Sequence, residues 1–165
     1  MGVSYQRADS CSKGFGRITR RTTVTNERSH LIMGFIDVIK ERAKSSIKTI
    51  VLPETEDMRT LEAADKILKE GIAKLVLVGN EEAVKKSAAE GGFDISGAQI
   101  VDPATSEKTQ GYIDKLVELR QKKGMTPEQA KEILLNQYLY YGVMMVKMGD
   151  ADGMVSGACH STADT

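Results

Sequence analysis

The sequence has few cysteines, no long apolar run and no excess of charge of either sign. Cys11 and Cys159 are its only cysteines and lie far apart, which argues against a disulfide framework and a cysteine metal cluster and favours a reducing compartment. The apolar runs fall far short of the ~20 residues that a membrane-spanning helix needs. Lys and Arg total 23, as do Asp and Glu, so the overall charge gives no indication of a nucleic-acid partner.

What the sequence does contain fits a globular chain of about one domain. Hydrophobic residues make up 41% of the 165 residues, without a low-complexity tract, so the chain has enough apolar side chains for a core. The zero net charge, however, is the sum of two unlike parts. Residues 1–32 have a net charge of +4 and little apolar periodicity, whereas residues 33–165 have a net charge of −4 and are regular. We therefore predict an extension over 1–32, disordered or non-native, and a domain over 33–165.

Three interpretations of this basic extension stay open. Its Arg-rich, Ser-rich and acid-poor composition resembles an organellar transit peptide; it could contact an anionic surface; or it is upstream sequence joined to a domain that begins at Met33. We favour the third. A glycine pattern from Gly14 to Thr19 resembles a dinucleotide-binding turn, but its third glycine is replaced and no buried strand precedes it, so we reject that motif.

Four short apolar runs predict strands over 49–53, 74–78, 98–101 and 153–155. They are continuous rather than alternating, which is typical of strands covered on both faces in a parallel sheet. Between them, helices are predicted from Met33 to about Lys44, and over 57–70, 80–90, 106–123 and 126–148. Thr126, Pro127 and Gln129 form the best helix start, while Gly142 inside that last helix predicts a kink or close packing.

This alternation of strands and helices predicts an α/β fold: a three-layer, open, mainly parallel sheet with helices on both faces. Ligands of such sheets bind outside the carboxyl ends of the strands. The segments to inspect are therefore 54–59, 79–80, 102–103 and above all 156–165.

The segment 156–165 leaves a strand through small residues and ends in hydroxyl and carboxylate groups that suit a helix start. Free backbone N–H groups at such a start attract anions, so a phosphate or acyl phosphate is one interpretation. The other is an ordinary strand-to-helix turn, and spacing alone favours it. Neither a Cys159–His160 dyad nor a metal site of Asp150, Asp152 and His160 has suitable spacing, and we predict no metal.

Arg59 is in the first turn of a predicted helix, where the helix dipole disfavours a cation. Either an anionic ligand or a salt bridge to a nearby acid explains it, the acids being Glu54, Glu56 and Glu62. Arg120 lies near a helix C-terminus, where a cation is favourable anyway, so its position alone indicates nothing.

Four segments together resemble the phosphate acetyltransferase (phosphotransacetylase) family: Thr49 to Thr60, Ile100 to Pro103, Glu118 to Arg120, and Asp152 to Thr165. The resemblance covers Met33 to Thr165 in order, and the last segment is its most specific part. It implies an acyltransferase that moves an acetyl group reversibly between acetyl phosphate and coenzyme A. It also implies a first domain of a two-domain fold with the active site in the cleft between the domains.

By this resemblance Arg59 and Arg120 bind coenzyme A and its phosphates. The other substrate-binding candidates are Ser156, Gly157, His160, Ser161 and Thr165. Coenzyme A, acetyl phosphate and phosphate are substrates, and no separate cofactor is implied. The family further implies a cytoplasmic enzyme that is a homo-oligomer in its full-length form, without nucleic-acid or membrane partners.

The chemistry requires a base for the coenzyme A thiol and cationic or N–H groups for the departing phosphate. The family's proposed base lies beyond the position of Thr165, so we expect the 165-residue chain to be a truncated first domain that is inactive alone. Alternatives are a phosphate butyryltransferase, the transferase-like tail of a malic enzyme, or a non-catalytic fragment that binds coenzyme A or a complementary chain.

Overall fold

The computed structural model describes residues 27–159, with side chains from residue 34 onward. The chain divides into two units, residues 1–35 and 36–165. Of the first unit only residues 27–35 are described, and they belong to helix α1 (Glu27–Ser45). This helix begins six residues before the predicted start at Met33. Its apolar side chains Ile36, Val38 and Ile39 are exposed, so the predicted amphipathic pattern does not lead to burial here.

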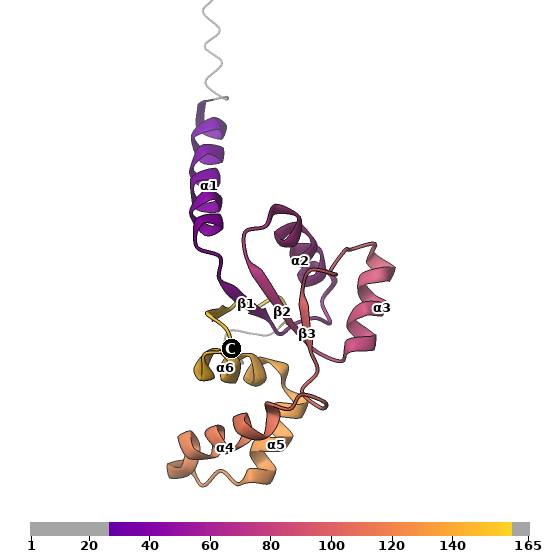
Figure 1. The fold of residues 1–165 in the computed structure, drawn as a ribbon, viewed down its shortest axis with the longest axis vertical. Helices are drawn as coiled ribbons and strands as arrows, with labels where there is room; N and C mark the ends of the chain where they lie inside the picture. The colour runs from indigo at the N-terminus through magenta and orange to yellow at the C-terminus, as the bar shows by residue number, and fades with distance from the viewer. Residues whose placement is uncertain (1–26, 160–165) are drawn as a thin grey trace, which may run out of the picture. The chain divides into compact units, whose positions relative to one another are not determined.

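The second unit is built on a four-stranded parallel sheet in the order β3-β2-β1-β4 (Figure 1). The strands are β1 (Thr49–Leu52), β2 (Lys74–Val78), β3 (Gln99–Val101) and β4 (Gly153–Met154). All four coincide within one residue at each end with the predicted runs. The α/β class and the parallel sheet are confirmed.

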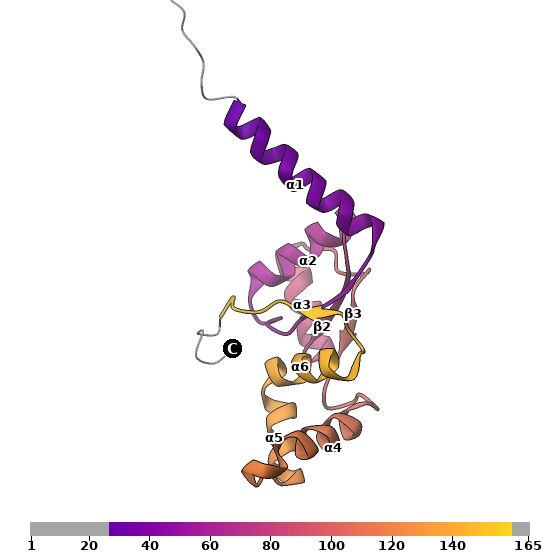
Figure 2. The ribbon, with the colours of Figure 1, turned by 90° about the vertical axis from the view of Figure 1, so that its left-hand side faces the viewer.

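Helices cover both faces of the sheet, which explains the continuous apolar strands (Figure 2). On one face α2 (Met58–Glu70) and α3 (Glu81–Gly91) pack with Leu52, Leu75 and Leu77. On the other face α4 (Thr109–Arg120), α5 (Pro127–Asn136) and α6 (Tyr138–Met148) form one cluster with Val51, Val76 and Val78. Successive strand residues therefore point into two different cores.

The strand order reverses at β1. The chain moves outward from β1 to β2 to β3 with its helices on one face, and then returns past β1 to β4 with its helices on the other face. Because parallel crossovers are right-handed, a reversal of direction requires this change of face. The carboxyl ends of β1 and β4 thus form the switch point at which sheets of this class bind ligands.

Helix boundaries follow local sequence in most places. Asp57 caps α2 through the backbone N–H of Arg59, and Asn80 caps α3 through that of Ala83. Thr126 and Gln129 form the predicted capping box of α5, with Pro127 at its first turn. The helix predicted over 106–123 is shorter, because α4 begins only at Thr109 and its last turn continues as a 3₁₀ helix, Gln121–Lys123.

The single helix predicted over 126–148 is wrong. The chain turns at Gln137 (φ −124°, ψ 89°) and makes α5 and α6 instead. One straight helix of that length would measure about 33 Å, whereas the strands beneath it are about 15 Å long. The break allows α6 to pack on β1, β2 and β4 while α5 packs against α4.

Gly142 lies inside α6 and causes no break. A Cβ added there would lie 2.7 Å from Met154 Sδ and 3.2 Å from Val51 Cγ1. Of the two predicted outcomes, close packing is therefore the one observed. None of the helices within residues 27–159 combines the length and the apolar character that crossing a membrane requires.

Candidate active site at the ends of strands β1 and β4

The candidate site begins where β1 and β4 end side by side. Pairing of the two strands continues past β4, since the Val155 N–H donates to the Val51 carbonyl at 3.0 Å. Residues 53–59 follow β1 and residues 155–159 follow β4, so parallel pairing brings these two segments together at the switch point. A pocket of about 220 Å³ lies between them, lined by Leu52, Glu54, Arg59, Thr60, Ala63, Val155, Ser156 and Ala158.

Glu54 is the buried centre of this site, with 4% of its surface exposed. Its Oε2 accepts from the backbone N–H groups of Gly157 and Ala158, each at 2.7 Å, and its Oε1 accepts from that of Cys159 at 3.2 Å. A buried carboxylate is costly unless it is hydrogen-bonded, and three successive backbone donors meet that requirement. These donors lie in the segment for which an anion bound by free N–H groups is one of the two interpretations from sequence; here a carboxylate of the chain itself binds them.

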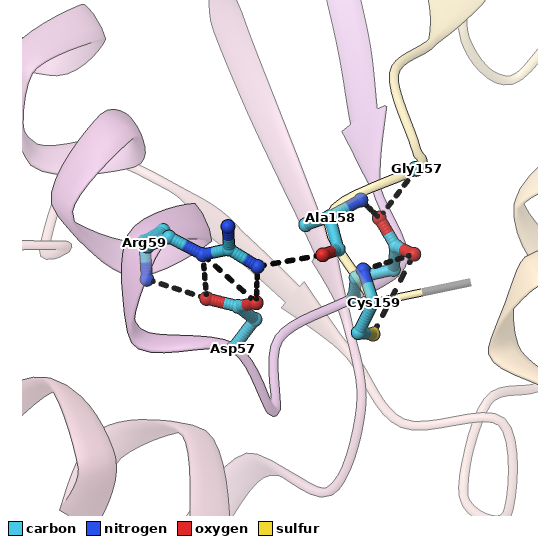
Figure 3. Close-up of polar contacts among 6 residues, drawn as sticks. Asp57, Arg59, Gly157, Ala158 and Cys159 are labelled. Atoms are coloured by element: carbon cyan, nitrogen blue, oxygen red, sulfur yellow. Dashed lines mark hydrogen bonds and ion pairs between the residues drawn. The ribbon is translucent and has the colours of Figure 1, made fainter. Parts of the chain in front are cut away.

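Arg59 contacts the same loop as a donor, at a backbone carbonyl, whereas Glu54 accepts from the loop's N–H groups (Figure 3). Its Nη2 donates to the Ala158 carbonyl at 2.6 Å and to Asp57 Oδ2 at 2.6 Å, while its Nε donates to both oxygens of Asp57. Arg59 remains 73% exposed at its side chain, and the hydrogen bonds that it donates lower the pKa of the Asp57 carboxyl.

Of the two explanations for Arg59, an anionic ligand or a salt bridge, the structure shows a salt bridge. The predicted choice of acidic partner is wrong. The partner is Asp57, the cap of the same helix, and not Glu54, Glu56 or Glu62. Glu54 instead binds the loop backbone, and Glu62 pairs with a lysine on its own helix.

Cys159 is exposed, and its thiol lies 3.5 Å from Glu54 Oε1. Desolvation and the hydrogen bond to Glu54 raise the pKa of this thiol, so the reactive thiolate is disfavoured at neutral pH. This environment is the opposite of the one that activates a cysteine nucleophile.

The loop between Ser156 and Cys159 is not helical, and Gly157 adopts a left-handed φ of 106° that suits glycine. The helix expected to begin in 156–165 therefore does not begin before Cys159. His160, Ser161 and Thr165 lie outside the described residues.

Arg120 lies in a different pocket, which shares no lining residue with the first. It ends α4 and borders a cavity of about 330 Å³ together with Leu116, Leu119, Leu139, Tyr140, Val143, Met144 and Lys147. Within the described residues, the structure thus brings Arg59, Ser156 and Gly157 together but gives Arg120 separate surroundings.

The carboxylates of the rejected metal site have separate structural partners. Asp150 accepts from the Tyr112 hydroxyl at 2.6 Å and pairs with Lys108, whereas Asp152 accepts from the Thr49 N–H at 2.8 Å. Across residues 27–159, no group of three His, Cys, Asp or Glu side chains is arranged to hold a metal ion.

Comparison with known proteins identifies the family. A sequence model described as phosphate acetyl/butaryl transferase matches residues 34–165. The chain belongs to this family. A phosphate acetyltransferase from Acetivibrio thermocellus is 55% identical over 133 residues, and one from Thermoanaerobacterium thermosaccharolyticum is 54% identical over 132. These matches cover 81% and 80% of this chain.

Solved structures agree with this assignment to the phosphate acetyl/butaryl transferase family. A phosphotransacetylase from Streptococcus pyogenes superposes with a TM-score of 0.75 at 36% identity, over 81% of this chain and 40% of its own. One from Staphylococcus aureus gives 0.71 at 40% identity, over 79% and 39%. The chain likewise spans 39% of the length of both curated relatives.

Glu54 is the site residue whose role sequence reasoning missed, because there it is only a possible partner of Arg59. Its position immediately after a buried strand, in a segment selected for inspection, was the available indication. Its partners could not be foreseen, because they are backbone groups 103 to 105 residues away.

Proposed function

We propose that this chain provides part of the active site of a phosphate acetyltransferase, which transfers an acetyl group between acetyl phosphate and coenzyme A. The observation that carries the proposal is the loop 156–159, fixed at the switch point of the sheet beside Arg59. The loop belongs to the most specific segment of the resemblance. Coenzyme A, acetyl phosphate and phosphate are the small molecules involved, and no bound cofactor is required.

In this reaction the coenzyme A thiol loses its proton to a base, and the thiolate attacks the acetyl carbonyl. A carbon–sulfur bond forms, the bond from the carbonyl carbon to the phosphate oxygen breaks, and phosphate leaves. Arg59 and Arg120 would bind anionic groups of the substrates, because guanidinium groups bind phosphate oxygens in a forked geometry. Ser156, Gly157, His160, Ser161 and Thr165 would line the acyl phosphate. The base would come from sequence that corresponds to the rest of the longer relatives.

Titration calorimetry of the 165-residue chain with coenzyme A tests the binding part. We expect Arg59→Ala and Arg120→Ala each to weaken binding about tenfold or more, because each removes charged hydrogen bonds. The control is Arg42→Ala, which removes an exposed arginine of α1. Affinity that is unchanged by both substitutions would contradict the assigned roles.

A chimera tests the catalytic part. Residues 34–165 replace their counterpart in the Acetivibrio thermocellus relative, and thioester formation from acetyl phosphate and coenzyme A is followed. We expect turnover by the chimera and none by the isolated 165-residue chain. Binding without turnover in the chimera would support the non-catalytic alternative, and normal turnover by the isolated chain would contradict the proposed division of the site.

A cytoplasmic location and self-association of the full-length form complete the proposal. Both come from the family resemblance. Sedimentation of the chimera and fractionation of the source cells would test them.

A further inference from the structure

The backbone of residues 157–159 is held from two sides by residues of one short segment. Glu54 accepts its three N–H groups, and Arg59 donates to the Ala158 carbonyl. Because the loop's donors and its carbonyl bind opposite charges, a displacement of the loop breaks contacts on both sides. The loop is thus fixed by side chains and not by a regular element of its own.

Glu54 is itself rigidly placed. Pro53 precedes it and is buried, and the proline ring fixes the dihedral φ of Pro53, where the chain leaves β1. Thr55 follows it, is 3% exposed and donates through Oγ1 to the Val78 carbonyl at 2.9 Å. The carboxylate therefore projects from a segment that is attached to both β1 and β2.

Arg59 is placed by the start of α2. Asp57 accepts from the Arg59 backbone N–H at 2.8 Å and from its side chain, so one carboxylate both caps the helix and orients the guanidinium. Both Nε and Nη2 are engaged by contacts within the chain. This geometry suits a side chain that connects two parts of the protein.

We infer that Glu54 and Arg59 are positioning residues, which hold the 157–159 backbone in the conformation that the acyl-transfer site uses. For its use of substrate this inference rests on the proposed function; the backbone contacts themselves are tested without substrate. Arg59 then acts on the site through Ala158 as well as by its charge.

The first test measures amide hydrogen exchange by NMR in the 165-residue chain. In Glu54→Ala, we expect Gly157, Ala158 and Cys159 amides to exchange about 10- to 100-fold faster, because each loses a charged acceptor. In Glu54→Gln one oxygen remains; we expect it to keep the two 2.7 Å bonds, so that only the Cys159 amide exchanges faster. Glu56→Gln is the control, since it makes the same charge change at an exposed neighbouring residue.

Unchanged exchange of all three amides in folded Glu54→Ala would overturn the inference. If that variant does not fold, Glu54→Gln decides by its residue-specific pattern: a faster Cys159 amide supports the inference, and three unchanged amides overturn it.

The second test separates positioning from charge at Arg59. Lysine retains the positive charge but lacks the fork that contacts Asp57 and Ala158 together. Without coenzyme A, we expect both Arg59→Lys and Arg59→Ala to speed exchange of the Gly157, Ala158 and Cys159 amides, because both remove the contact with the Ala158 carbonyl, whereas unchanged exchange in both variants would overturn the positioning role. If the wild-type chain binds no coenzyme A, the proposed function fails in this form, and amide exchange still decides the role of Glu54.

Discussion

Replacing Gly142 with alanine has two opposite effects on stability: it favours the helix and it crowds the core. Alanine in the middle of a helix is favoured over glycine by about 1 kcal/mol. Here the added Cβ would lie 2.7 Å from Met154 Sδ and 3.2 Å from Val51 Cγ1, and Val51 is fully buried in β1. Overpacking of this kind costs about 1–3 kcal/mol. We therefore expect Gly142→Ala to lower the free energy of unfolding by about 1 kcal/mol.

The assay is urea unfolding followed by circular dichroism. With a slope of about 2 kcal/mol per molar urea, the midpoint should fall by about 0.5 M. The matched control is Gly111→Ala in α4, where an added Cβ meets no atom within 4 Å. That variant should be unchanged or up to about 1 kcal/mol more stable.

A double variant identifies the origin of the cost. In a Met154→Ala background the nearest atom is gone, so the cost of Gly142→Ala should shrink and the two substitutions should couple by about 1 kcal/mol. Gly142→Ala as stabilising as Gly111→Ala in the native background would refute the reasoning.

Three further predictions concern other contacts. Hydrogen bonds from Lys108 and Tyr112 lower the pKa of Asp150, so the ionised carboxylate stabilises the fold above about pH 4 and this stabilisation is lost as the pH falls. Asp150→Asn should therefore make acid unfolding, followed by circular dichroism, less steep. Because the pKa of the Cys159 thiol is raised, its alkylation by iodoacetamide in a Cys11→Ser background should be slow at pH 7, and fast alkylation there would contradict this. Thr126→Ala should lower the free energy of unfolding by about 1 kcal/mol in urea titrations, since it removes the cap of α5.

The sheet could be predicted from sequence because each strand is a short, continuous apolar run. A run such as Leu75 to Val78 is apolar at every position, short and followed by Gly79, which is typical of a strand between two cores. Local caps such as Asp57 and Thr126 are equally direct, since their partners lie two or three residues away. The turn at Gln137 carries no proline or glycine and depends on what lies beneath α6, so local sequence could not place it.

For the candidate site, sequence predicts which segments meet but not the contacts between them. Parallel strands bring residues 54–59 and 156–159 to one edge, and sequence located both segments. The ion-pair partner of Arg59 could not be predicted, because several acidic residues lie near it in the sequence. The observed partner, Asp57, is also the cap of the helix. The role of Glu54 depends on the pairing of β1 with β4, which hydrophobic periodicity does not predict.

The 103 residues that separate Glu54 from Gly157 also bear on the order of folding. The segment from β1 to β3 makes its sheet contacts between neighbouring elements, whereas β4 joins β1 only after the whole excursion through α4, α5 and α6. Closing such a long loop is entropically slower than closing the short crossovers. The contacts of Glu54 with the loop are therefore expected among the last to form, and protection of the Gly157 and Ala158 amides would serve as a kinetic marker for completion of the sheet.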